Sequence, residues 1–368
     1  MKSVFSEAAE TSAAAAELVA KLEGTDPVLI LFFTWHEHDG AAISKALNAA
    51  YPNAQVAGAT TAGEFTHERY GHDGVVAIAF GQSKVKRCAS AWVRMGAGVE
   101  AGMNDAVAML SSTFGSLREL DPARHVGFVL NTFMPPHEEE VNEALGHAAP
   151  LLSFVGGSAG DNYQIKRTQV FLNGEASDDA SVLVLMETGV PFSIVKTSSF
   201  EPTGKKLEIT KIQGRVVYEL DGQPALPTYA AAVGVPVEAL DHPVYLQNPL
   251  GLMIDGKPWV RSPIQALPDG GLLFGAAMIE GSEMNLMRPT DLFGDTRAAL
   301  AEGAARLGGN VSCGVIFNCA HRSIGIEMRG LQKEFANLFG DYPVAGFNSY
   351  GESWLTHINQ TLIGLLFG

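Results

Sequence analysis

The sequence predicts a mixed α/β fold of layered sheets with flanking helices, built from repeated strand–helix–strand units, together with an antiparallel hairpin region. Three observations predict it. The order strand, helix, short strand and glycine-rich turn recurs three times along the chain. The first strand of each unit is a continuous apolar run, which is typical of strands covered on both faces. Residues 191–309 interrupt the repeat with alternating strands and turn signals.

Each repeated unit is expected to begin with a buried strand, at residues 28–34, 126–132 and 311–318. A loop that carries histidine follows, and an amphipathic helix comes next, at residues 42–50, 138–148 and 331–339. A proline near its end stops each helix, at Pro52, Pro150 and Pro343. Ahead of the first unit, residues 1–24 are expected to form an Ala-rich amphipathic helix.

The glycine-rich turns are the candidate binding elements. They end the runs 56–64, 154–161 and 344–352, and another apolar strand follows each, at 75–80, 182–186 and 361–367. Glycine permits close approach of the backbone to a ligand, hydroxyl groups add donors, and an acid closes each turn. The candidate ligand-binding residues are Thr60, Thr61, Glu64, Gly157, Ser158, Asp161, Asn162, Asn348, Ser349 and Glu352. The alternative is structural, because the same turns could simply close a packed sheet edge.

The antiparallel region is expected to contain strands at 205–210 and 215–220, and two longer runs at 252–260 and 271–278. Asp255-Gly256 and Asp269-Gly270 are typical hairpin turns. Short helical pieces are expected at 229–232 and 237–240. A helix over 291–306 then leads into the third unit.

Composition limits the possible partners. The chain has 368 residues and a formal net charge of −15, so binding to nucleic-acid phosphates is not expected. Three cysteines are too few for a disulfide framework, which favours a reducing, cytoplasmic compartment. No stretch approaches the ~20 apolar residues of a membrane span, so no membrane insertion is expected. The low charged fraction leaves room for a homo-oligomer interface.

Motifs for enzymes are absent or weak. The sequence has no P-loop, no HExxH, no CxxC and no GxSxG. A hydrolase would have to use Ser158, or Cys319 beside His321, without the spacing of an assembled nucleophile site. His36 and His38 offer two metal ligands, whereas a closed zinc site needs about four. We therefore expect no catalytic residue.

The last strand carries an unusual polar face. His357, Asn359 and Thr361 fall on one side by the period of two, in an otherwise apolar segment. Such a face must meet solvent, buried partners or a ligand. Asn359 is therefore a further candidate ligand-binding residue, and the imidazole of His357 could supply an axial ligand to haem iron.

Several of these motifs resemble those of FIST-domain proteins. The resemblance rests on Thr60-Thr-Ala-Gly-Glu64, the run 156–162, Val344 to Glu352, and His357-Ile-Asn-Gln-Thr361. It implies a FIST N-terminal part at 1–190 and a FIST C-terminal part at 191–368, the latter with the antiparallel region at 191–309 and a final unit at 310–368. It also implies a sensory, input-type module of bacterial signalling.

Within that family, the stand-alone NosP group looks most similar, on Asn162-Tyr163, residues 167–171 and residues 218–222. This similarity implies haem as cofactor, nitric oxide as ligand and a separate histidine kinase as partner, with His357 as the candidate axial ligand. A sensor of a small polar metabolite such as an amino acid remains the alternative, in which the turn N–H groups would bind a carboxylate. Glu64, Asp161 or Glu352 would then pair with the amine. A hydrolase is a third hypothesis.

Overall fold

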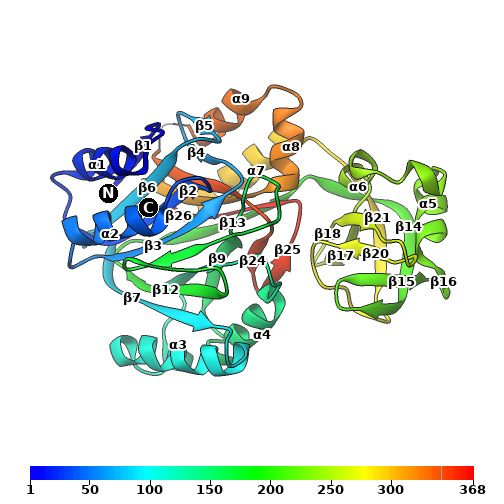
Figure 1. Ribbon diagram of the computed structural model, residues 1–368, viewed down its shortest axis with the longest axis horizontal. Coiled ribbons are helices and arrows are strands. Elements are labelled where there is room, and N and C mark those ends of the chain that lie inside the picture. Colours follow the sequence, from blue (N-terminus) through cyan, green and yellow to red (C-terminus); the bar gives the residue numbers. More distant parts are fainter. Residues whose placement is uncertain (341) are drawn as a thin grey trace.

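The computed structural model describes residues 1–340 and 342–368 and has two parts (Figure 1). The core consists of residues 1–199 and 290–368, and the lobe consists of residues 200–289. The mixed α/β class, with flanking helices and an antiparallel region, is confirmed.

Three six-stranded sheets form the core, one for each repeated unit. The first sheet has the order β1 (Lys2–Ser6), β6 (Val75–Gly81), β2 (Pro27–Trp35), β3 (Gln55–Thr61), β10 (Val170–Leu172) and β11 (Glu175–Ser177). The second has the order β25 (Thr356–Ile358), β24 (Glu352–Trp354), β9 (Ser153–Ser158), β8 (His125–Asn131), β12 (Ala180–Thr188) and β7 (Val85–Arg94). The third has the order β13 (Phe192–Ser198), β26 (Thr361–Phe367), β22 (Cys313–Cys319), β23 (Val344–Ser349), β4 (Glu64–Thr66) and β5 (Tyr70–Gly71).

The three sheets exchange hairpins in a cycle. In each sheet two parallel strands of one unit, β2 and β3, β8 and β9, or β22 and β23, lie beside a hairpin that follows the second strand of another unit. Thus β10 pairs with β3, β24 with β9, and β4 with β23. Strands from before and after residue 190 therefore share the second and third sheets.

The inner faces of the three sheets meet in one apolar centre. Phe33 on β2, Phe128 on β8 and Phe317 on β22 are fully buried, one from the first strand of each unit. The ring of Phe317 lies 6.1 Å from that of Phe33 and 6.2 Å from that of Phe128. The continuous apolar runs of these strands follow from this burial on both faces.

Helices cover the outer face of each sheet (Figure 1). The first sheet carries α1 (Thr11–Leu22) and α2 (Gly40–Ala50), and the second carries α3 (Val99–Phe114) and α4 (Glu138–Ala148), with the short η1 (Leu117–Glu119). The third carries α7 (Leu292–Arg306), α8 (Ala320–Glu327), α9 (Gln332–Ala336) and η3 (Asn337–Phe339).

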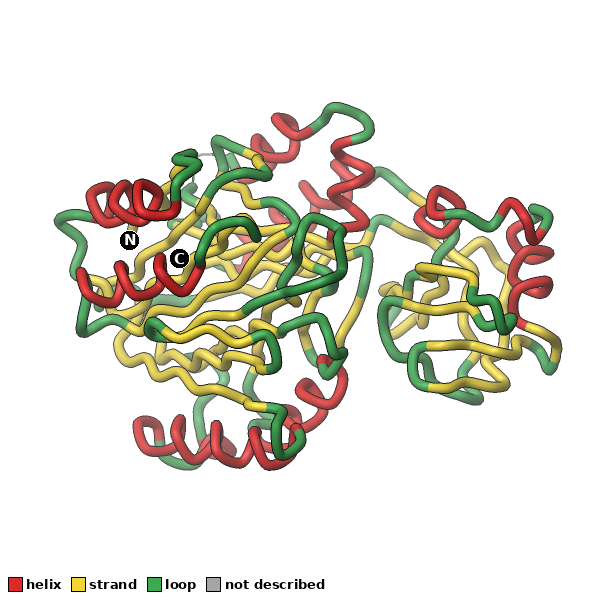
Figure 2. The backbone as a smooth tube through the Cα atoms, in the orientation of Figure 1, coloured by secondary structure: helices red, strands yellow, loops and turns green. Residues whose placement is uncertain are grey.

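The lobe is a strongly curved antiparallel sheet with short helices at one side (Figure 2). Its strands follow the order β18 (Lys257–Arg261), β17 (Leu250–Ile254), β21 (Glu283–Pro289), β14 (Phe200–Gln213), β15 (Val216–Leu220), β20 (Leu272–Phe274) and β19 (Pro263–Ala266), with β16 (Gln223–Pro224) on β15. Its helices are α5 (Ala225–Val233), η2 (Val237–Ala239) and α6 (His242–Gln247). Phe200 pairs with Pro289 where the chain enters and leaves, so a two-stranded ribbon joins lobe and core.

Three local predictions were wrong. Residues 2–6 form strand β1 rather than the start of the N-terminal helix, because their backbone completes the edge of the first sheet against β6. His321 lies in the first turn of α8 rather than in a loop, and the predicted helix over 331–339 is divided into α9 and η3. No described helix has the length and apolar character needed to cross a membrane.

Candidate functional site

Backbone hydrogen bonds join the three glycine-rich turns of the repeated units, here called the corners, to one another. The bonds run from the Asn348 N–H to the Gly63 carbonyl (2.7 Å), from the Gly160 N–H to the Thr60 carbonyl (2.9 Å), and from the Ser158 N–H to the Gly351 carbonyl (2.9 Å). A Cβ on Gly160 would lie 2.6 Å from the Ala62 nitrogen. The corners therefore need glycine for close packing of backbone on backbone. The three N–H groups named here already have partners inside the fold.

Two of the corner acids, Glu64 and Glu352, are buried and accept hydrogen bonds from neighbouring groups of the core. Glu64 accepts hydrogen bonds from the Thr61 hydroxyl at 2.9 Å and the Gly74 N–H at 2.7 Å. Glu352 accepts from the hydroxyls of Ser349 at 2.7 Å and Thr361 at 2.6 Å. Burial raises the pKa of both carboxyl groups to about 8. Both are therefore mostly protonated at neutral pH.

The corner of the second unit is built differently. The Asp161 carboxylate accepts from the Tyr350 hydroxyl at 2.6 Å and from the backbone N–H groups of residues 165–167. Burial acts to raise the pKa of Asp161, but these hydrogen bonds outweigh it and lower the pKa. The Ser158 hydroxyl, which matches Ser349 by position, donates to Glu138 at 3.0 Å. Asp161 thus fixes the loop at residues 165–167, whereas Glu64 and Glu352 bond to the strands and turns around their own corners.

A cavity of about 280 Å³ lies between the core and the lobe. The core contributes the ends of β8, β9, β22 and β23, and parallel strands often present a ligand at their carboxyl ends. Its lining consists of Phe133, Tyr163, Ile165, Cys319, Ala320, His321, Ile324, Tyr350 and Asn359 from the core, and His242, Ile264 and Gly275 from the lobe. A ligand here would touch both parts of the molecule.

Two histidines in the wall of this cavity pack against each other. The rings of His321 on α8 and His242 on α6 are edge to face, with centroids 5.4 Å apart. Burial, reinforced by the neighbouring His242, lowers the pKa of His321 to about 4, and burial lowers the pKa of His242. The His321 imidazole is therefore neutral near pH 7. The Nδ1 atom of His321 is buried and has no hydrogen-bond partner among the described residues.

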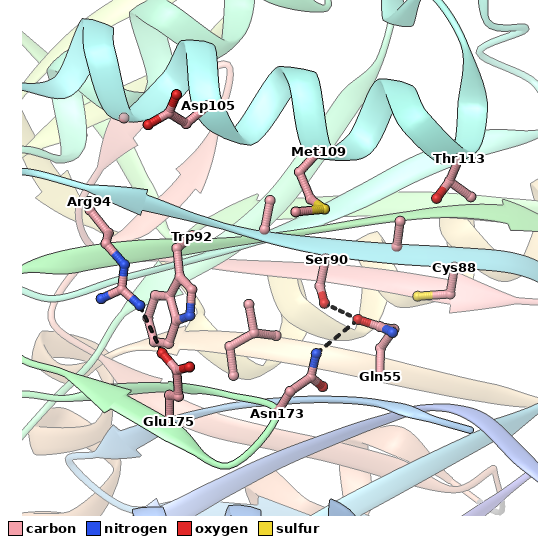
Figure 3. A pocket seen from close by; sticks show the side chains of 14 residues that line it. Gln55, Cys88, Ser90, Trp92, Arg94, Asp105, Met109, Thr113, Asn173 and Glu175 are labelled. Atoms are coloured by element: carbon pink, nitrogen blue, oxygen red, sulfur yellow. Dashed lines mark hydrogen bonds and ion pairs between the residues drawn. The ribbon is translucent and has the colours of Figure 1, made fainter. Parts of the chain in front are cut away.

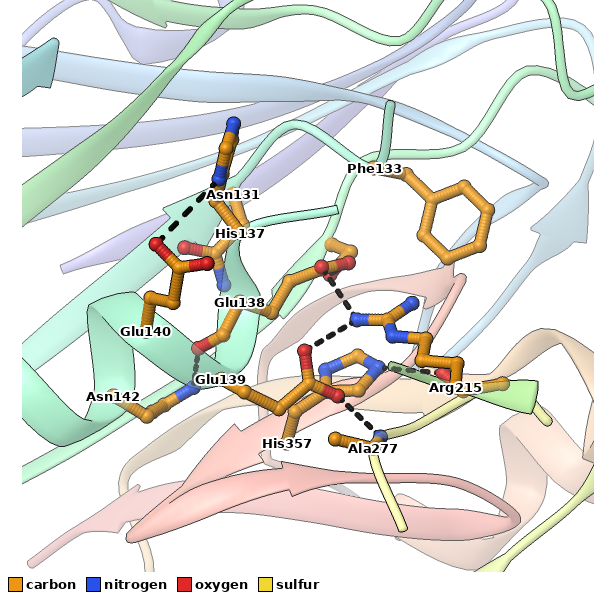
Figure 4. Close-up of polar contacts among 12 residues, drawn as sticks. Asn131, Phe133, His137, Glu138, Glu139, Glu140, Asn142, Arg215, Ala277 and His357 are labelled. Carbon is orange, nitrogen blue, oxygen red and sulfur yellow. Dashed lines mark hydrogen bonds and ion pairs between the residues drawn. The ribbon is translucent and has the colours of Figure 1, made fainter. Parts of the chain in front are cut away.

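His357 lies behind the cavity wall. Its Nε2 is 3.1 Å from the Gly275 carbonyl, which identifies Nε2 as the donor of the hydrogen bond drawn from His357 in Figure 4. A Cβ on Gly351 would lie 2.1 Å from its Cε1. The residue is fully buried, and burial lowers its pKa. Its Nδ1 also has no partner within the described part of the chain. The ring is packed between backbone segments, and it is not part of the cavity lining.

A buried charge network beside His357 fastens the lobe to the core (Figure 4). Arg215 of the lobe donates to Glu138 at 2.7 Å and to Glu139 at 2.6 Å, both on α4. The Ala277 N–H of the lobe also donates to Glu139, at 2.6 Å. Burial acts to raise the pKa of Glu139, but His357, Arg215 and the Ala277 N–H together lower it to about 2.

Two family models match most of this chain. The FIST N domain matches residues 28–223, and the FIST C domain matches residues 225–354. The chain belongs to the FIST family. FIST is a sensory domain of signalling proteins. An uncharacterized protein of Methanocaldococcus jannaschii is 27% identical over 180 residues, which are 45% of this FIST chain and 35% of that protein. The FIST chain thus spans about a third of the length of that relative.

The structure separates the predicted site residues of this FIST protein into two groups. Asn359 lines the cavity, Asp161 holds the loop that presents Tyr163 and Ile165, and Asn162 lies in that loop. The other predicted residues are buried around the interlocked corners: Thr60, Thr61, Glu64, Gly157, Ser158, Asn348, Ser349, Glu352 and His357.

Several cavity residues were not predicted from the sequence. Tyr163 directly follows the Asp161-Asn162 pair, so the turn motif could have included it. His242, Ile264 and Gly275 come from the lobe, and no local pattern relates them to the core.

The candidate nucleophiles and metal ligands of this FIST chain are placed as follows. Cys319 lines the cavity close to His321, but burial raises the pKa of its thiol, and a protonated thiol is a weak nucleophile. The Ser158 hydroxyl donates a hydrogen bond to Glu138. Within residues 1–340 and 342–368, no three side chains of His, Cys, Asp or Glu meet as a metal site requires.

A larger groove of about 570 Å³ lies elsewhere in the FIST chain, between β7, α3 and the β10–β11 hairpin (Figure 3). Its polar side chains bond to each other: Asn173 donates to Gln55 at 3.1 Å, and Arg94 donates to Glu175 at 2.8 Å. Because these polar groups satisfy one another, the groove offers a ligand fewer free hydrogen-bonding groups than the cavity beside His321 does.

Proposed function

We propose that this FIST protein is the sensory component of a bacterial signalling system and that its ligand binds in the cavity between core and lobe. The observation that carries the proposal is the composition of the cavity wall, to which both parts contribute side chains. A ligand that binds better when the wall is closed would stabilise the docked lobe, and a partner could detect that shift in population.

The finer form of this proposal takes haem as cofactor and nitric oxide as signal. A haem ligand needs a histidine nitrogen that is free and reaches the cavity. His357 does not meet that requirement in this conformation, because its Nε2 bonds to the Gly275 carbonyl and its ring is enclosed. His321 meets it better, since it lines the cavity and its Nδ1 has no partner among the described residues. Bound haem would supply an iron centre for the gas, and His321 would hold it.

An amino-acid ligand finds less support in the contacts. None of the residues that line the cavity is an Asp, Glu, Lys or Arg. Glu64, Asp161 and Glu352 are each bonded to side chains and backbone of the core. We therefore do not take that alternative further.

An absorption titration tests the proposal in its haem form. The full chain is titrated with haem, reduced, and exposed to nitric oxide. We expect a Soret band distinct from that of free haem, which shifts with the gas and is lost or moved in His321→Ala. The control His147→Ala, on the exposed side of α4, should keep the band. A spectrum of free haem in every sample would contradict haem sensing.

A second measurement concerns the output. We propose a separate histidine kinase as the partner of the loaded protein. The expected effect is a change in kinase autophosphorylation, followed with radiolabelled ATP, when loaded and unloaded protein are compared. Equal phosphorylation in both states would contradict a kinase output.

A further inference from the structure

The cavity between core and lobe has no formally charged side chain in its wall. Most of its polar atoms already have partners. The Tyr350 hydroxyl donates to Asp161 at 2.6 Å, and the Tyr163 hydroxyl lies 2.6 Å from the Ser323 hydroxyl. The Asn359 side chain accepts from the Ser262 N–H at 3.3 Å and donates to the Gly275 carbonyl at 3.4 Å. These residues therefore present mainly rings and apolar edges to a ligand.

His321 differs from these residues. Its Nδ1 is buried and has no partner among the described residues, although an unsatisfied buried polar atom costs roughly 1–3 kcal/mol. His321 is part of the cavity lining, so a molecule bound there that reached Nδ1 would satisfy it. The ring of His242 faces it from the lobe. Since the His321 ring is uncharged near neutral pH, it offers a ligand a hydrogen bond rather than an ion pair.

The aromatic side of the cavity is held in an unusual conformation. Asn162, Tyr163 and Ile165 have φ angles of 53°, 61° and 51°. Left-handed backbone is uncommon outside glycine and is a genuine outlier for a β-branched residue such as Ile165. The Asp161 carboxylate keeps the loop in place through three backbone N–H groups. Strain of this kind is concentrated at ligand clamps, and here it places Tyr163 and Ile165 against the cavity.

We propose that this cavity selects a small, uncharged, planar molecule with one hydrogen-bond donor, and that His321 Nδ1 accepts that bond. The inference rests on the proposed function and restricts its ligand. Transfer of a charged group into an apolar cavity without a partner is strongly unfavourable, so charged analogues are excluded. A haem would be compatible with this exclusion of charge only if its apolar ring entered the cavity and its carboxylates stayed outside.

Three related probes separate charge from hydrogen bonding: indole, 1-methylindole and indole-3-carboxylate. Their binding to the full chain is measured by isothermal titration calorimetry. We expect indole to bind, 1-methylindole to bind roughly threefold to tenfold more weakly for want of its N–H, and indole-3-carboxylate to show no measurable binding. In His321→Phe, indole and 1-methylindole should bind equally, because the ring remains and the acceptor is lost.

Two controls keep the test decisive. His147→Phe changes an exposed histidine on α4 and should retain the preference for indole. Ile324→Trp adds volume to a wall residue and should abolish binding of every probe, which locates the site. Melting temperatures establish that each variant is folded before its binding is compared.

The outcomes distinguish the inference from the proposed function. Equal binding of indole and indole-3-carboxylate, abolished by Ile324→Trp, would overturn the restriction to uncharged ligands and leave the cavity as the sensory site. A preference for indole that survives in His321→Phe would overturn the role of Nδ1. If no probe binds, the inference fails, and the haem titration still tests the sensory proposal.

Discussion

At the scale of single residues, similar acids have opposite surroundings. Glu352 is buried among hydroxyl groups, and burial raises its pKa to about 8. Asp161 receives three backbone N–H groups and a tyrosine hydroxyl, and its pKa is lowered. Both acids close a glycine-rich turn in the sequence, so the motif alone does not determine which of them is ionised.

Glu352→Gln tests this difference. A carboxyl group whose pKa is raised in the folded state stabilises below its unfolded value near 4.5, and this stabilisation is lost as the pH rises through about 8. The amide has no proton to lose, so the melting temperature of the variant should fall less than that of the wild type over this range. Glu64→Gln should act in the same direction. The exposed Glu143→Gln serves as the control, and identical pH profiles for all variants would contradict the assignment.

The candidate site was only partly predictable at this scale. Asp161 and Asn359 were found because acids after glycine turns and polar faces on apolar strands are visible in the sequence. Cys319 and His321 were noted together as a possible reactive pair, but the cavity beside them was not predicted. His242 reaches that cavity from the lobe, 79 positions away in the chain (321 − 242). Such contacts depend on how the parts dock and leave no local pattern.

At the scale of elements, the glycines of the corners have a steric role. The backbone of one unit packs directly on another at Gly160, where a side chain would meet the Ala62 nitrogen at 2.6 Å. Gly146 in α4 differs, because no atom lies within 4 Å of the position its Cβ would take.

Two alanine substitutions compare these positions. We expect Gly160→Ala to lower the free energy of unfolding by about 1–3 kcal/mol, because the backbone must shift. Gly146→Ala should raise it by about 0.5–1 kcal/mol, because alanine loses less conformational freedom in a helix. Urea denaturation measures both. A Gly160→Ala variant as stable as the wild type would show that the corner can relax.

The elements were more predictable than their pairing. The three repeated units, the hairpin turns at Asp255-Gly256 and Asp269-Gly270, and the strands at 205–210 and 215–220 follow from periodicity and turn chemistry. The exchange of hairpins between units does not, since a strand such as β4 has the same alternation whichever sheet it joins. The edge strand β1 was missed because its five residues carry little periodicity.

At the scale of the whole molecule, the lobe depends on a few buried polar contacts in addition to its ribbon. Within residues 1–340 and 342–368, Arg215 is the only cation of the lobe that forms ion pairs with acids of the core. Glu138, one of its partners, is fully buried. Removing one member of a buried ion pair leaves an uncompensated charge.

Arg215→Met should therefore loosen the lobe. We expect a destabilisation of about 3–5 kcal/mol and faster amide exchange at residues 275–277, measured by hydrogen-exchange mass spectrometry. Arg288→Met breaks an exposed pair with Glu201 on the ribbon and should cost no more than about 1 kcal/mol. Adding Glu138→Gln and Glu139→Gln to Arg215→Met should restore part of the loss. Unchanged exchange in Arg215→Met would show that other contacts hold the lobe.

The cyclic exchange of hairpins makes the core indivisible. A fragment that stopped at residue 190 would lack β22, β23 and β26, and its β4 and β9 would have no neighbour on one side. Such bare edges are templates for aggregation. The two halves that the sequence outlines are thus not separable building blocks. Recombining FIST halves from different proteins would require that the hairpins of each half still pair with the other half, as β4 does with β23 and β24 with β9.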